Sequence, residues 1–91
     1  MSQNQTSLQA FVFITIEPGL VQQACRYIGR LKTVQEVHMA FGPYDAIVRL
    51  RAKDLKELGR LVEREIQPIP GVLKTLTCLA VAPSEEQPLE S

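Results

Sequence analysis

The feature of this sequence that most constrains its fold is the order in which strand-like and helix-like hydrophobic patterns follow one another. Residues 10–16 (A-F-V-F-I-T-I) are β-branched and aromatic, and Glu17-Pro18-Gly19 follows them, which is typical of a strand that ends in a turn. The apolar period then changes to that of a helix. We therefore expect a helix whose inward side is formed by Leu20, Ala24, Tyr27, Ile28 and Leu31.

The middle of the chain has the pattern of a hairpin. Residues 34–41 are extended in character, Gly42-Pro43-Tyr44-Asp45 supplies a turn, and residues 46–51 form the returning strand. Two neighbouring antiparallel strands are therefore expected on either side of this turn.

A second helix and a final strand follow the hairpin. Asp54 with Glu57 three residues later is the pattern of a capping box, which begins a helix. Pro68 and Pro70 end this helix, and residues 72–81 form the last strand. The inward side of the helix is expected to consist of Leu55, Leu58, Leu61, Val62 and Ile66.

The resulting order, β-α-β-β-α-β, predicts an α+β, ferredoxin-like fold. Two right-handed helical crossovers around a central hairpin give a four-stranded antiparallel sheet with both helices on one face. The other face of such a sheet is left open, and in water it should be polar.

The first and last strands carry apolar residues on both faces, which is unusual for a sheet with one open face. In the first strand, Phe11 and Phe13 lie opposite the aliphatic side, and the last strand is similarly two-sided. Soluble monomers rarely tolerate a contiguous apolar patch of this kind. We therefore expect a second subunit to cover the open face, with Phe11 and Phe13 at the dimer interface of a dimeric α/β barrel.

Composition argues against several classes of protein. Ten Lys and Arg against ten Asp and Glu give a formal net charge of zero, unlike the basic surface of a free-standing nucleic-acid binder. No apolar run approaches the roughly 18–20 residues of a membrane span, and the polar residues 1–7 lack the features of a signal peptide. A cytoplasmic protein without direct contacts to nucleic acid or membrane is the expectation.

The cysteines and the histidine form no recognisable site. Cys25 and Cys78 lie far apart in the sequence, and His38 is the only histidine. These residues are too few to suggest a disulfide scaffold or a zinc site, so we expect no metal and no cofactor. We interpret His38 as a surface or interface residue.

Five short motifs run along the chain at a characteristic spacing. They are I-E-P-G at 16–19, V-Q-E-V at 34–37, G-P-Y-D at 42–45, D-L-K-E-L at 54–58 and I-P-G-V-L-K-T-L-T at 69–77. With them, the chain resembles the C-terminal effector domain of the Lrp/AsnC family of transcriptional regulators, the RAM domain. The resemblance covers residues 10–81, and the third motif followed by the last is its most specific part.

The resemblance implies a domain organisation. Residues 10–81 would form the ligand-binding and oligomerisation domain, flanked by disordered tails at residues 1–9 and 82–91, whose composition is polar or acidic. Full members of the family carry an N-terminal helix-turn-helix domain, which nine polar residues cannot hold. The expectation is therefore a stand-alone form of the effector domain.

The resemblance also implies a function. Family dimers often assemble into octamers, and small effectors, commonly amino acids, bind between dimers near the hairpin turn. This chain is then expected to sense an amino acid or similar metabolite and to modulate transcription through protein assembly. Partners would be further copies of itself and, by the same interfaces, full-length Lrp/AsnC regulators.

The effector site implied by the resemblance is built around the hairpin turn. Backbone N–H groups near Gly42 would attract a carboxylate, and Asp45 would bind an α-amino group. Pro43 and Tyr44 complete the turn, and Pro43 removes one N–H donor from it. The other expected contacts are hydroxyls from Thr75 and Thr77 of a neighbouring subunit, with Met39 and Cys78 shaping the side-chain pocket.

Structural alternatives stand beside these roles. Asp45 is equally well interpreted as a turn-capping residue, Tyr44 as interface packing, and Thr75 with Thr77 as ordinary strand residues. Phe41 replaces the small polar residue frequent in the family, and its ring is expected to narrow the pocket or to change its preference.

Three other functions remain open at this point. An ACT-like amino-acid-binding domain shares the element order and would bind its ligand at Pro18-Gly19-Leu20. A small dimeric-barrel enzyme is less favoured, because the sequence shows no Ser/His/Asp arrangement or carboxylate pair. The third alternative is a purely structural oligomer without an effector.

Overall fold

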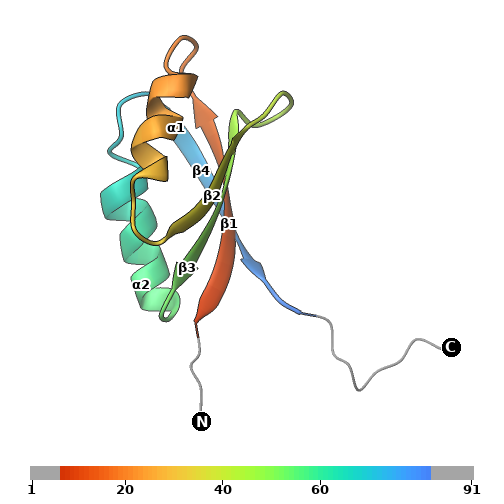
Figure 1. Ribbon diagram of the computed structural model, residues 1–91, viewed down its shortest axis with the longest axis vertical. Coiled ribbons are helices and arrows are strands. Elements are labelled where there is room, and N and C mark those ends of the chain that lie inside the picture. Colours follow the sequence, from red (N-terminus) through yellow and green to blue (C-terminus); the bar gives the residue numbers. More distant parts are fainter. Residues whose placement is uncertain (1–6, 83–91) are drawn as a thin grey trace, which may run out of the picture.

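The computed structural model describes residues 7–82, and its elements follow the predicted order (Figure 1). The strands are β1 (Leu8–Ile16), β2 (Val34–Met39), β3 (Ala46–Ala52) and β4 (Val72–Ala80). The helices are α1 (Val21–Gly29) and α2 (Leu55–Leu61), and α2 continues into a wider turn, η1 (Val62–Ile66).

β1 begins earlier than the sequence pattern predicted. Leu8 and Gln9 pair with β3, so they belong to the sheet and not to the tail expected over residues 1–9. Composition misplaced this boundary because a polar residue such as Gln9 is compatible with either a tail or a strand. Of the two expected tails, residues 1–6 and 83–91 lie outside the described residues.

The strands form one antiparallel sheet in the order β2-β3-β1-β4, and both helices cover the same face (Figure 1). The predicted ferredoxin-like fold is confirmed. Alternate residues of the two central strands, β1 and β3, are buried beneath the helices. The core consists of Ala10, Val12, Ile14, Ile16, Ala24, Cys25, Ile28, Ala46, Val48, Leu50, Ala52, Leu58, Leu61, Val62 and Ile66.

The inward side of α1 differs from the prediction at Tyr27. Ala24, Cys25 and Ile28 are buried, whereas Tyr27 is 45% exposed. At about 100° per residue, the three buried positions share one arc of the helix and Tyr27 falls outside it. The Arg30 guanidinium instead lies over the Tyr27 ring, 5.9 Å from its centroid.

The predicted capping box at the start of α2 is present. The Asp54 carboxylate accepts a hydrogen bond of 2.8 Å from the Glu57 backbone N–H, and the Glu57 carboxylate accepts one from the Lys53 N–H. The prediction for Leu55 was wrong, since this side chain is 62% exposed. It lies in the first turn of the helix, at the rim of a groove between α2 and β4.

The helix ends in a feature that the sequence pattern did not indicate. In η1, the Gln67 N–H donates to the Val62 carbonyl at 2.9 Å, a hydrogen bond that spans five residues instead of four. The chain then turns into β4 at Gly71, whose φ of +98° favours glycine. A Cβ at this position would lie 2.9 Å from the Leu20 Cβ, so the turn packs directly on the start of α1.

Candidate functional site

The face of the sheet without helices is apolar near β1 and β4. Register places Phe11 opposite Cys78 and Phe13 opposite Leu76 on this open face. Both Phe side chains are half-buried by their neighbours, and Leu76 is 48% exposed. The open face is therefore apolar at the positions where the sequence predicted it.

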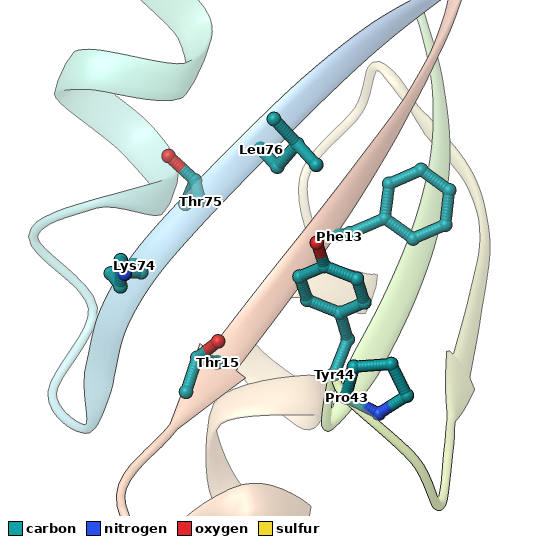
Figure 2. A pocket seen from close by; sticks show the side chains of 7 residues that line it. All are labelled: Phe13, Thr15, Pro43, Tyr44, Lys74, Thr75 and Leu76. Carbon is teal, nitrogen blue, oxygen red and sulfur yellow. The ribbon is translucent and has the colours of Figure 1, made fainter.

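A pocket of about 380 Å³ lies at the edge of this face, between β1, β4 and the loop that joins β2 to β3 (Figure 2). We call it the open-face pocket. Its floor contains two neighbouring cross-strand pairs, Phe13 with Leu76 and Thr15 with Lys74. The complete lining is Phe13, Thr15, Pro43, Tyr44, Lys74, Thr75 and Leu76.

The β2–β3 loop forms the wall of the open-face pocket. The Tyr44 ring packs against the Phe13 ring with centroids 5.3 Å apart and planes tilted by 45° (Figure 2). Pro43 precedes it, and Gly42 has a φ of +149°, a backbone conformation that favours glycine. Aromatic packing thus fixes the loop against β1 and keeps the pocket open beside it.

Asp45 anchors the end of this loop and does not line the pocket. Its carboxylate oxygen Oδ2 accepts a hydrogen bond of 2.7 Å from the Ile16 backbone N–H. Its own N–H donates to the Ile14 carbonyl at 2.8 Å, and its carbonyl accepts from the Ala40 N–H at 2.9 Å. Of the two roles considered for Asp45, these contacts support the structural one.

The structure brings together only some of the residues predicted to bind an effector. Pro43, Tyr44 and Thr75 line the open-face pocket, and Phe13, expected at the dimer interface, joins them. The others lie elsewhere. The predicted residues that do not line this pocket are Met39, Gly42, Asp45, Thr77 and Cys78.

The two threonines of β4 face the helices and not the open face. Thr75 pairs with Ile14 and Thr77 with Val12, both core positions. The Thr75 hydroxyl is bonded to the Gln67 side-chain amide at 3.0 Å, and in Figure 2 it points away from the rings of Phe13 and Tyr44. Thr75 and Thr77 together line the groove of about 280 Å³ between α2 and β4.

Met39 and Phe41 also lie away from the pocket. Met39 ends β2 opposite Ala46 and is exposed, and the Phe41 side chain is fully exposed in the loop. Neither is among the residues that line the open-face pocket, so Phe41 does not narrow it in this chain.

Three residues that line the pocket, Thr15, Lys74 and Leu76, were not predicted from the sequence. Alternation along a strand places Thr15 on the same face as Phe13, and Lys74 on the same face as Leu76. The face of each residue could therefore be predicted from the sequence. That Thr15 and Phe13 lie beside Lys74 and Leu76 depends in addition on the register between β1 and β4, which are separated by more than half of the chain.

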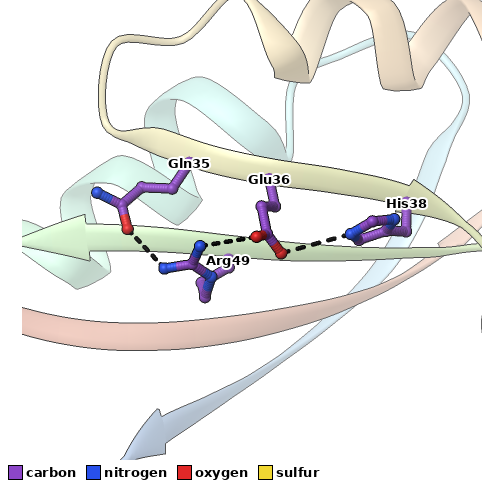
Figure 3. Close-up of polar contacts among 4 residues, drawn as sticks. All are labelled: Gln35, Glu36, His38 and Arg49. Carbon is purple, nitrogen blue, oxygen red and sulfur yellow. Dashed lines mark hydrogen bonds and ion pairs between the residues drawn. The ribbon is translucent and has the colours of Figure 1, made fainter.

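A polar network lies on the open face at the opposite edge of the sheet (Figure 3). Arg49 donates to Glu36 and to Gln35, each at 2.8 Å, and His38 lies 3.4 Å from the Glu36 carboxylate. The hydrogen bond from Arg49 and, to a smaller extent, that from His38 lower the pKa of Glu36. The hydrogen bond between Arg49 and Glu36 also raises the pKa of Arg49. The exposure of His38 agrees with its interpretation as a surface or interface residue.

The two cysteines occupy different environments. Cys25 is buried on the inward side of α1, and this burial, with a smaller effect of the Asp45 carboxylate, raises the pKa of its thiol. Cys78 is exposed on the open face. Within residues 7–82, no cluster of three or more His, Cys, Asp or Glu side chains is arranged to hold a metal ion.

Neither helix in the described part of the chain has the length and apolar character needed to cross a bilayer.

A known family accounts for this combination of fold and sequence. The Lrp/AsnC ligand binding domain matches residues 9–88. The chain belongs to this family. Its two most specific motifs are G-P-Y-D at 42–45 and I-P-G-V-L-K-T-L-T at 69–77. In this Lrp/AsnC domain, residues of both motifs line the open-face pocket, on opposite sides.

Individual relatives support the assignment. The HTH-type transcriptional regulator PH1916 from Pyrococcus horikoshii is 33% identical over 81 residues, which are 86% of this chain and 54% of that protein. The chain spans about half the length of the curated relatives it matches.

Two solved structures illustrate the fold. TTHA0845 from Thermus thermophilus is 36% identical, with a TM-score of 0.79 over 85% of this chain and 96% of that chain. The feast or famine regulatory protein Rv3291c from M. tuberculosis, complexed with L-methionine, has a TM-score of 0.72 at 23% identity, over 88% of this chain and 55% of that one. At this identity, the second likeness shows a shared fold.

Proposed function

We propose that this chain is a regulatory module that binds a small metabolite of amino-acid size in the open-face pocket and modulates transcription through protein assembly. The observation that carries the proposal is the convergence of the two most specific family motifs on one pocket of about 380 Å³. A volume of this size is within the range of small-ligand sites. The pocket combines apolar walls with a few polar groups, as such sites usually do.

The second part of the proposal is self-association through the open face. Phe11, Phe13, Leu76 and Cys78 form its apolar part, on β1 and β4, and the network around Arg49 forms a polar part, on β2 and β3. Stable protein interfaces usually combine an apolar region with polar groups beside it. The zero net charge of the chain adds no long-range repulsion between copies.

Ligand binding and assembly would then be coupled, because the open-face pocket borders the surface that a second copy covers. A ligand that contacts both copies would stabilise the assembly by mass action. Full-length Lrp/AsnC regulators carry a related domain, so we include hetero-assembly with them in the proposal, together with a cytoplasmic location.

The complex of Rv3291c with L-methionine supports a ligand of amino-acid size, since that protein shares the fold. The ACT-like alternative is less well supported. It would place the ligand at residues 17–20, where the Glu17 N–H already donates to the Gly71 carbonyl at 2.7 Å and the Leu20 N–H to the Glu17 carbonyl at 3.0 Å. A binding role also agrees better than catalysis with a pocket that contains one charged residue.

Thermal unfolding with a panel of amino acids and related carboxylates tests this function. A ligand at about ten times its Kd is expected to raise the Tm of the wild-type chain by about 5 °C or more. Tyr44→Ala should abolish the rise because it removes the pocket wall, whereas Tyr27→Ala, an exposed tyrosine on α1, should retain it. The proposal is wrong if no member of the panel stabilises the wild-type chain at millimolar concentration.

A further inference from the structure

We propose that the open-face pocket prefers monocarboxylates that lack an ammonium group, such as 2-oxo acids with an apolar side chain, over the corresponding amino acids. The inference rests on the proposed function, because it concerns the ligand of the same pocket. Two observations support it: the pocket is lined by a positively charged side chain, and the nearby carboxylates are bonded to other groups of the chain.

Among the residues that the structure describes, Lys74 is the one charged side chain that lines the open-face pocket. It stands on β4 directly opposite Thr15 of β1, so its ammonium group and the Thr15 hydroxyl rise from the same face at neighbouring positions. An ammonium group and a hydroxyl side by side can both donate to one carboxylate. The pocket therefore has a place for a single negative charge.

Residues 7–82 offer the pocket no corresponding place for a positive charge. Asp45 is the acidic residue of the adjoining loop, and its Oδ2 is bonded to the Ile16 N–H. Glu36, also on the open face, lies on β2 at the far edge of the sheet and is paired with Arg49 at 2.8 Å. Neither carboxylate lines the pocket.

The remaining walls favour an apolar ligand body. Phe13, Tyr44, Pro43 and Leu76 surround the space beside Lys74 (Figure 2). The Thr75 hydroxyl is already engaged by the Gln67 side-chain amide. The α-ammonium group of an amino acid would lose water among these groups, next to the ammonium group of Lys74. Loss of hydration and like-charge repulsion both disfavour it, whereas the carbonyl oxygen of a 2-oxo acid can accept from a hydroxyl.

Calorimetric titration with matched ligand pairs tests this preference. The pairs are 4-methyl-2-oxopentanoate with leucine and phenylpyruvate with phenylalanine, each titrated into the full chain. We expect each oxo acid to bind at least about tenfold more tightly than its amino acid, since loss of hydration from an unpaired ammonium group beside Lys74 costs enough for one order of magnitude or more. Equal or tighter binding of the amino acids would overturn the inference while leaving the proposed function intact.

Substitutions that remove or reverse the charge of Lys74 provide a second test of this ligand preference. Lys74→Gln should weaken oxo-acid binding about tenfold or more, and Lys56→Gln, an exposed lysine on α2, should leave it unchanged. Lys74→Glu should reverse the preference within each pair. Lys74 is exposed, so circular dichroism should show all three variants folded. Unchanged oxo-acid affinity in Lys74→Gln contradicts the inference, and absence of binding by both members of both pairs contradicts the proposed function as well.

Discussion

At the scale of single residues, Asp45 shows how one side chain can support a pocket that it does not line. Its carboxylate accepts a hydrogen bond of 2.7 Å from the Ile16 N–H, which lies at the end of β1, where the register with β4 shifts. Asp45 therefore ties the loop that carries Tyr44 to the strand that carries Phe13 and Thr15.

Replacing Asp45 should reveal this role as a loss of stability. Asp45→Ala leaves a partly buried N–H without its acceptor, and the free energy of unfolding should fall by about 1–3 kcal/mol. Asp45→Asn keeps an acceptor oxygen and should lose clearly less. Urea denaturation of the two variants measures the difference. Equal stability of Asp45→Ala and the wild type would show that the hydrogen bond contributes little.

The two thiols should differ sharply in reactivity. Burial favours the neutral form of Cys25 and raises its pKa, so little thiolate is available at a pH of about 8, whereas Cys78 is exposed. With the open face uncovered, as expected for the Phe11→Lys variant described below, titration with a thiol reagent should label one site per folded chain and a second site only after denaturation. Cys78→Ser should abolish the fast phase, and rapid labelling of Cys25 in the folded chain would contradict the burial.

The same pKa shift sets the sign of a pH effect on stability. Because the folded state holds the Cys25 proton more tightly than the unfolded state, this thiol stabilises the fold fully below the ordinary thiol pKa of about 8.5. That contribution is then lost as the pH rises through the higher pKa of the folded state.

At the scale of elements, the turn into β4 depends on a glycine for two separate reasons. Gly71 and Gly19 both have positive φ, at +98° and +90°, but only at Gly71 would a Cβ meet a neighbour, 2.9 Å from the Leu20 Cβ. Gly19→Ala is therefore a matched control for backbone strain alone.

Both glycine variants should be less stable than the wild type. Strain of the left-handed backbone should cost each about 1–2 kcal/mol, and Gly71→Ala should lose more because Leu20 must move. Thermal unfolding of the pair measures this. A Gly71→Ala chain as stable as Gly19→Ala would mean that the turn relaxes without cost.

Most elements of this fold could be predicted from local signals. The Asp54–Glu57 capping box and the placement of Phe11 and Phe13 opposite the aliphatic side of β1 depend on a few neighbouring residues, and both appear in the structure as expected. The errors, at Tyr27, at Leu55 and in η1, concern how a helix is rotated and wound against the sheet. Packing decides these features, and local periodicity constrains them only loosely.

The candidate site was less predictable than the fold, because it combines distant segments. The hairpin motif correctly indicated Pro43 and Tyr44, which line the pocket. Thr77 and Cys78 were both predicted to contact the effector, although neighbouring residues of a strand face opposite sides of the sheet. Lys74 and Thr15 become neighbours only through the pairing of β1 with β4. The charge of the pocket therefore became visible only in three dimensions.

At the scale of the whole molecule, the open face is proposed to be an interface between two copies. Sedimentation equilibrium at micromolar concentration should show the wild-type chain as a dimer or a larger assembly. Phe11→Lys places a charge in the apolar part of the face, outside the pocket lining, and should shift the chain towards monomer. Leu55→Lys, on an exposed leucine of the helical side, should not. A wild-type chain that sediments as a clean monomer would contradict self-association.

The central claim, that this Lrp/AsnC domain binds its ligand in the open-face pocket, is tested most directly by nuclear magnetic resonance of methyl groups during ligand titration. The panel member that stabilises the chain most should shift the Thr15 and Leu76 methyl signals, both from the pocket lining. The signals of Leu55 and Thr77, in the groove between α2 and β4, should stay in place. Shifts confined to Leu55 and Thr77 would place the ligand behind the sheet and contradict the account.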